Sequence, residues 1–189
     1  MRRTTLVCAL SAFGMSLLLF GANAVAGDDK GKGKGHDSVR IHLKGFEEVP
    51  VVVTNAAGNL ELDINDAAPS IAYELSYDGL EGNVAQAHIH IGQKNVNGGI
   101  VLWLCQATSR APAQIAATTP ECPQSGTVSG TLTPASVLVP ASPNTQGIGT
   151  GNGATAWADV LRAIRAGKAY ANVHTSIAAG GEIRGQLPH

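Results

Sequence analysis

The dominant pattern of the chain, from Val39 onward, is an alternation of apolar and polar residues. Side chains at alternate positions of a strand point to opposite faces, so this pattern predicts strands with one buried face. Leu60, Leu62 and Ile64, for example, alternate with Glu61 and Asp63. Turns rich in Gly, Asn and Asp separate the predicted strands, which are residues 39–43, 60–64, 71–77, 86–91, 100–105, 126–132, 169–175 and 182–187.

One segment, between residues 155 and 167, has a helical period instead, and one predicted strand, residues 100–105, departs from the alternation. Thr155 is the predicted N-cap of the helix and Gly167 its C-terminal stop. Residues 100–105 are apolar on both faces, which predicts a central, covered strand. We therefore expect an all-β fold: an antiparallel β-sandwich or barrel-like domain with one short α-helix in the C-terminal half. The helix has one apolar stripe, formed by Trp157, Val160, Leu161 and Ile164.

Histidines in two of the predicted strands mark the candidate site. His88 and His90 share one face of their strand, opposite Ala87 and Ile89, and His174 lies on a strand near the C-terminus. If the two strands lie in the same sheet, the three imidazoles converge. Two histidines at i and i+2 with a third from another strand form a common copper or zinc site.

Two hypotheses follow for this cluster. In the first, the histidines are structural and lie beside a polar network that fixes the sheet edge. In the second, they bind copper or zinc, with Glu182 as a candidate further ligand; by analogy alone the pattern is similar to the copper site of copper–zinc superoxide dismutases, so redox activity is part of this hypothesis. The residues predicted for the polar network are Asn172, Glu182, Arg184 and Gln186.

The N-terminus predicts export. Residues 1–26 have a basic start at Arg2 and Arg3, an apolar run and small residues before two candidate cleavage positions, Ala24 and Ala26, which is typical of a secretory signal peptide. Residues 27–38 read as a flexible charged Gly/Lys linker, and residues 39–189 as one domain. We therefore expect a secreted or periplasmic protein with no membrane span after cleavage.

The two cysteines of the expected mature chain fit this compartment. Cys105 and Cys122 are predicted to form a disulfide because an exported chain folds under oxidising conditions. It would stabilise the fold by roughly 3 kcal/mol. The alternative, a pair of thiolate metal ligands, matches no zinc spacing pattern.

Charge and motifs exclude two functional classes. The chain has 13 basic and 14 acidic residues; losing Arg2 and Arg3 leaves 11 against 14, a charge near −3, which argues against nucleic-acid binding. No nucleophile motif, metalloprotease motif or phosphate loop is found, so we expect no enzymatic activity. Glu47 and Glu48 are interpreted as solvated charges on a bend.

Four segments in register resemble one known family. They are Gly45–Pro50 (GFEEVP), Ala87–His90 (AHIH), Gly167–Thr175 (GKAYANVHT) and Gly181–Leu187 (GEIRGQL). Together they are similar to the CHRD domain, the module named after the extracellular antagonist chordin, which also occurs in exported microbial proteins with a single domain.

The resemblance implies an extracellular β-rich domain without established catalysis. We therefore expect a non-catalytic extracellular or envelope module that binds a ligand or protein partner not identified by the sequence, or that has a structural role. The growth-factor partners of chordin do not transfer to a single-domain protein, because a fold does not determine a function.

Overall fold

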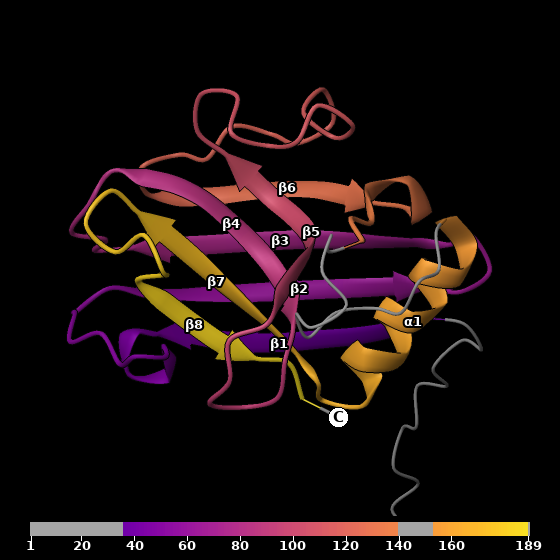
Figure 1. Ribbon diagram of the computed structural model, residues 1–189, viewed down its shortest axis with the longest axis horizontal. Helices are drawn as coiled ribbons and strands as arrows, with labels where there is room; N and C mark the ends of the chain where they lie inside the picture. Colours follow the sequence, from indigo (N-terminus) through magenta and orange to yellow (C-terminus); the bar gives the residue numbers. More distant parts are fainter. Residues whose placement is uncertain (1–35, 140–152, 189) are drawn as a thin grey trace, which may run out of the picture. The chain divides into compact units, whose positions relative to one another are not determined.

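Eight antiparallel strands form one nearly closed, barrel-like sheet in the computed structural model, which describes residues 36–139 and 153–188 (Figure 1). The order across the sheet is β5-β4-β7-β8-β1-β2-β3-β6. This confirms the predicted fold class. The elements are β1 (His36–Lys44), η1 (Gly45–Glu47), β2 (Ala57–Asn65), β3 (Ser70–Asp78), β4 (Val84–Ile91), β5 (Gly99–Gln106), β6 (Gly126–Leu132), η2 (Pro134–Ser136), α1 (Gly153–Arg165), β7 (Ala169–Thr175) and β8 (Ile183–Gln186).

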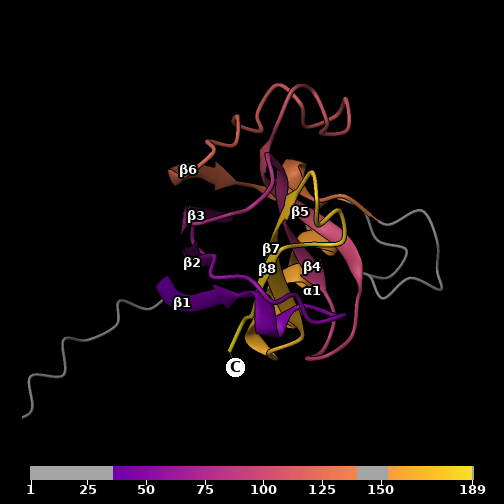
Figure 2. The ribbon, with the colours of Figure 1, turned by 90° about the vertical axis from the view of Figure 1, so that its left-hand side faces the viewer.

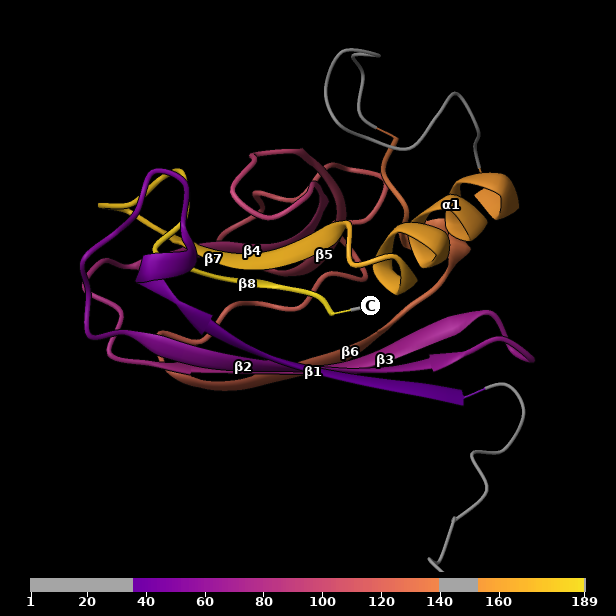
Figure 3. The same cartoon turned by 90° about the horizontal axis from the view of Figure 1, so that it is seen from below.

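The sheet folds over so that its two halves face each other. β1, β2, β3 and β6 lie on one side, β4, β5, β7 and β8 on the other, and α1 lies at one end (Figures 2 and 3). Apolar side chains of both halves fill the space between them, as the alternation predicts. Leu60, Leu62 and Ile64 are at most 1% exposed. β7 is buried along its whole length, so its outer face must also be covered.

The helix packs through its predicted stripe, and all four stripe residues are buried. It begins at Gly153, so Thr155 lies inside the helix and the prediction of an N-cap there is wrong. The end is confirmed: Gly167 has a φ of +66°, and its N–H donates to Ile164 O at 3.0 Å. A left-handed residue at this position is a common way to terminate a helix, and glycine adopts it without strain.

β5 is not central, contrary to the prediction; it is one end of the strand order. Its edge is nevertheless covered, because Gln106 bridges to Glu121 and the N–H of Leu138 donates to Val101 O at 2.9 Å. Cys105 and Cys122 form the predicted disulfide beside this bridge. The strand is apolar on both faces because its inner face lines the core and Trp103, on the other face, packs beneath residues 111–116.

The first strand begins earlier than its apolar pattern indicates. β1 starts at His36, so residues 36–38 pair with β2 and do not belong to the linker. The predicted signal peptide and the rest of the linker, residues 1–35, lie outside the described residues. None of the helices within residues 36–139 and 153–188 has the length and apolar composition needed to cross a membrane.

Candidate functional site

The candidate site lies on the face of β4, β7 and β8 that points away from the core. The register places His88 opposite Asn172 on β7, and Asn172 opposite Arg184 on β8. His88 Nδ1 lies 3.2 Å from His174 Nε2, and one ring nitrogen from each of His88, His90 and His174 lies within 4.8 Å of the others. The predicted convergence of the three imidazoles is therefore confirmed.

Backbone carbonyls determine which nitrogen carries the hydrogen in two of the rings. His90 Nδ1 donates to Gly98 O at 3.0 Å, and His174 Nδ1 donates to Ala179 O at 2.9 Å. A carbonyl oxygen can only accept, so both Nδ1 atoms must be protonated. In a neutral ring, Nε2 then carries no hydrogen and has a free lone pair.

Burial keeps the rings neutral. His88 is 0% exposed, and His90 and His174 are 6% exposed. Burial is the largest cause that lowers the pKa of His90, to about 4, and it also lowers the pKa of His174. The pKa of His88 is lowered by burial and further by the neighbouring histidines. At neutral pH all three rings therefore offer lone pairs.

The lone pairs of two rings point at a third acceptor. Asn172 Oδ1 lies 2.9 Å from His174 Nε2 and 3.0 Å from His90 Nε2. His88 Nε2 is fully buried and has no hydrogen-bond partner among the described residues. The cluster is therefore rich in acceptors and poor in hydrogens, and this imbalance requires an explanation because buried polar atoms are normally satisfied.

Aromatic rings enclose the cluster. Tyr170 stacks on His90 with ring centroids 4.6 Å apart, and its hydroxyl accepts the N–H of Gly98 at 3.1 Å. Trp103 contacts His88 edge-on at 4.2 Å between centroids. Neither residue was among the sequence-based predictions. Tyr170 could have been found, since it precedes Asn172 by two positions and shares its face, whereas Trp103 lies on a strand without alternation.

The predicted polar residues do not form one network at a sheet edge. β8 lies inside the sheet between β7 and β1, and each side chain bonds a different segment. Arg184 stacks over Tyr170 and donates to Asn97 Oδ1 at 3.1 Å and to Val96 O at 2.9 Å. It thereby fastens the loop that presents Gly98 O to His90. Gln186 Nε2 donates to Gly92 O, Gly167 O and Ala169 O.

Glu182 does not join the histidines. Its carboxylate accepts from Thr175 Oγ1 at 2.6 Å, Thr54 Oγ1 at 3.2 Å and the N–H of Glu81 at 2.8 Å. Both oxygens are engaged, so it fastens two loops to β7 and is not a ligand of the cluster.

Glu48 is buried, contrary to the prediction that both glutamates are solvated. It is 5% exposed, whereas the partly exposed Glu47 pairs with Lys94 at 3.3 Å. Burial raises the pKa of Glu48 to about 7, although the charge of Arg184 and hydrogen bonds from Asn172 and the Val49 backbone act in the opposite direction. The site therefore contains a carboxyl group beside Asn172 that sequence reasoning did not place there.

A groove of about 400 Å³ leads toward this carboxyl group. The loops before β2 and between β7 and β8 form its walls, and Val51 and Ile177, 57% and 65% exposed, lie among its lining residues. We call it the Glu48 groove. Its lining residues are Glu48, Val49, Pro50, Val51, Val52, Glu81, Ile177, Ala178, Ala179, Gly180, Gly181 and Glu182.

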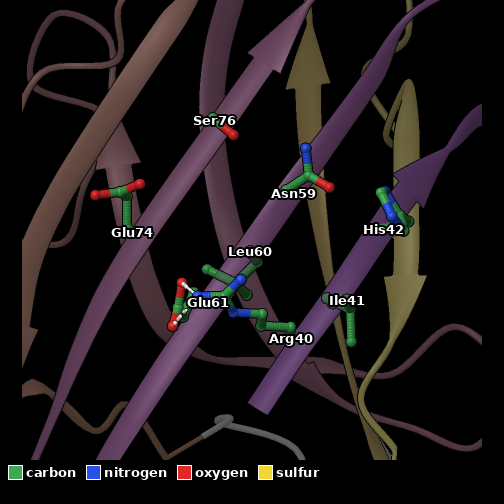
Figure 4. Close-up of a pocket in the computed structure, with 8 residues that line it drawn as sticks. All are labelled: Arg40, Ile41, His42, Asn59, Leu60, Glu61, Glu74 and Ser76. Atoms are coloured by element: carbon green, nitrogen blue, oxygen red, sulfur yellow. Dashed lines mark hydrogen bonds and ion pairs between the residues drawn. The ribbon is translucent and has the colours of Figure 1, made fainter. Parts of the chain in front are cut away.

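A second hollow, of about 350 Å³, lies over β1, β2 and β3 (Figure 4). Its charged residues include Arg40 and Glu61, which pair at 2.8 Å, and His42 is the single histidine that lines it. Within residues 36–139 and 153–188, the three histidines of the cluster are the only group of three or more metal-ligating residues.

Comparison with known proteins supports the resemblance noted above. Searches of curated proteins and of solved structures gave no match. A protein-family comparison matches the CHRD domain over residues 39–187, most of the chain. That range contains every side chain of the cluster and the whole barrel-like sheet except the start of β1. The chain therefore belongs to the CHRD domain family.

Proposed function

We propose that the protein is an exported binding module that holds one copper or zinc ion between His88, His90 and His174. Membership of the CHRD family supports a non-catalytic binding or structural module at the family level. Imidazole nitrogen is a favoured ligand of both metals. For this chain, we propose that the ligand of the binding module is the metal ion, and we assign no catalytic reaction to the protein.

The observation that carries this proposal is the direction of the lone pairs. His90 and His174 each give their Nδ1 hydrogen to a backbone carbonyl, which is the usual second contact of a metal-binding histidine. Ligand nitrogens about 2.1 Å from one ion are at most about 4.2 Å apart. The nitrogens of His88 and His174, 3.2 Å apart, satisfy this limit, and one nitrogen from each of the three rings lies within 4.8 Å of the others, which is close to it.

A structural cluster without metal is the second candidate. If the amide of Asn172 turned over, Nδ2 would donate to both Nε2 atoms, and the cluster would need no cation. Oδ1 would then face Gly180 O, which Nδ2 now meets at 3.4 Å, and the carboxyl group of Glu48. A protonated Glu48 could donate to Oδ1, so this arrangement is chemically consistent too.

Export is part of the proposal. The N-terminal pattern of residues 1–26 supports it, and the Cys105–Cys122 disulfide fits an oxidising compartment. A secreted or periplasmic protein would meet copper or zinc outside the cytoplasm.

Titration calorimetry with the untagged, chelator-treated mature protein tests the metal. We expect one Zn²⁺ or Cu²⁺ per chain, a melting temperature raised by several degrees, and nitrogen hyperfine structure in the Cu²⁺ EPR spectrum. A ligand that binds only the folded state must stabilise it. His174→Gln should abolish all three signals.

His42→Gln is the matched control. His42 lies on β1 in the hollow shown in Figure 4, away from the cluster, and should leave binding unchanged. No heat of binding and no change in melting temperature at saturating metal would leave the structural candidate in place.

A further inference from the structure

The charged residues that line the Glu48 groove are all acidic. Its three charged lining residues are Glu48, Glu81 and Glu182, and no basic residue lines it. Glu182 is fully engaged by Thr54, Glu81 N–H and Thr175. Glu81 is exposed, whereas Glu48 is buried. A cation that enters the groove therefore meets the exposed Glu81 first and the buried carboxyl group of Glu48 after it.

One oxygen of Glu48 is without a partner. Oε1 is buried and accepts no hydrogen bond from any described residue. It lies against the backbone of Gly181, where an added Cβ would clash with it and would come within 2.5 Å of Asn172 Nδ2. Glycine thus leaves the space in which the carboxyl group and the amide meet. An unsatisfied carboxylate oxygen in such a place calls for a missing donor or cation.

From this oxygen a continuous series of polar groups reaches the histidines. Glu48 Oε1 and Asn172 Nδ2 both lie beside Gly181, and the Oδ1 atom of Asn172 faces His90 and His174 on its other side. The groove wall also includes Ala179, whose carbonyl oxygen accepts from His174 Nδ1. Asn172 and the backbone of Ala179 therefore connect the residues of the groove with the histidines.

We propose that the Glu48 groove is the entry route of the metal ion and that Glu48 is its transfer ligand. The carboxylate takes up the partly dehydrated cation and passes it across Asn172 to the three imidazoles. Glu48 is not a ligand of the final site. This inference rests on the proposed metal site and adds to it a defined direction of uptake.

Stopped-flow uptake of Zn²⁺ by the metal-free mature protein tests the route. We expect Glu48→Gln to slow both uptake and chelator-driven release at least tenfold, because a transfer ligand acts on both directions. One ion should still bind per chain at equilibrium. Glu47→Gln is the matched control, since it makes the same chemical change at the adjacent residue, whose carboxylate pairs with Lys94, and it should leave both rates unchanged.

A second pair of variants leaves every polar group in place. Val51 lines the groove and is 57% exposed, while Val53 does not line it and is 78% exposed. Val51→Trp should obstruct the entrance and slow uptake several-fold. Val53→Trp adds the same bulk outside the groove and should not.

The outcomes separate the two proposals. Unchanged uptake in both Glu48→Gln and Val51→Trp, with one ion still bound, would overturn the entry route and leave the metal site standing. Loss of equilibrium binding in a folded Glu48→Gln variant would overturn the transfer role, because Glu48 would then belong to the final site. No binding by the unmodified protein would remove the metal site itself.

Discussion

At the scale of single residues, Glu48 is unusual because it is a buried carboxyl group without an ion pair among the described residues. Its side chain is buried between Asn172 and Gly181 on the face of the sheet that carries the histidines. Burial raises its pKa from 4.5 to about 7, so between these values the folded protein holds a proton that the unfolded chain has released.

This carboxyl group should give stability a negative slope with pH. Its contribution to the free energy of unfolding, about 3 kcal/mol in total, is fully present below pH 4.5 and is lost as the pH rises toward about 7. The buried histidines act in the opposite direction, because their lowered pKa values make stability rise with pH over the acidic range.

Comparison with Glu48→Gln isolates the carboxyl group, since the histidines are common to both proteins. In urea unfolding of the metal-free forms, the free energy of unfolding of the variant, relative to that of the unmodified protein, should rise between pH 5 and pH 8. Parallel pH profiles for Glu48→Gln and the unmodified protein would mean that the carboxyl group titrates normally.

The histidines and Glu48 show where sequence patterns carry information about single residues. His88 and His90 lie two apart on a strand, so their common face follows from the strand period alone. Glu47 and Glu48 are identical side chains on a bend, and no period assigns one of them to the interior. The loop enters the site only because the folded β8 and Gly181 lie beside it.

At the scale of elements, α1 depends on Trp157 for its docking. The indole is 4% exposed and belongs to the main core at one end of the sheet. Trp157→Ala should cost about 3–5 kcal/mol in free energy of unfolding, measured by urea denaturation, which is the range for truncating a buried aromatic.

Arg162→Ala on the same helix is the comparison. Arg162 is largely exposed and pairs only with Asp159 at 2.6 Å among the described residues, so its loss should cost at most about 0.5 kcal/mol. Equal effects of the two substitutions would mean that the stripe does not anchor the helix.

The helices and strands themselves were easier to predict than their positions relative to one another in the sheet. Alternation identified strands such as β2 and β3, a run of apolar residues identified β5, and the spacing of Trp157, Val160 and Leu161 identified the helix. The position of β5 was mispredicted, because apolar residues on both faces indicate cover and not centrality. Residues 107–121 provide much of that cover, and the loop has no pattern that reveals its place.

At the scale of the whole described molecule, the two halves of the sheet are joined by a short contact. β8 pairs with β1 through a single register pair, Lys44 with Arg184. At the opposite end of the strand order, the disulfide fastens the loop after β5 to the strand. The half of the sheet that carries the histidines is thus held at both of its margins.

Removing the disulfide should weaken the fold measurably. Cys105→Ala with Cys122→Ala should lower the free energy of unfolding by about 3 kcal/mol, because the unfolded chain regains the freedom of a loop of 17 residues. Urea unfolding with and without reductant checks this. The reductant should bring the unmodified protein down to the stability of the variant and leave the variant unchanged; no effect on either would contradict it.

The place of β7 in the sheet also determines when a metal site could exist during the life of the chain. β7 lies between β4 and β8, and His174 is 86 residues beyond His88 in the sequence. Translation therefore delivers His88 and His90 long before their partner, and the third imidazole is in place only once the last strands have paired. A chain that is translocated unfolded carries no assembled site with it. Under the proposed function, the ion is acquired after export, and the metal content of the protein reports the supply on the far side of the membrane.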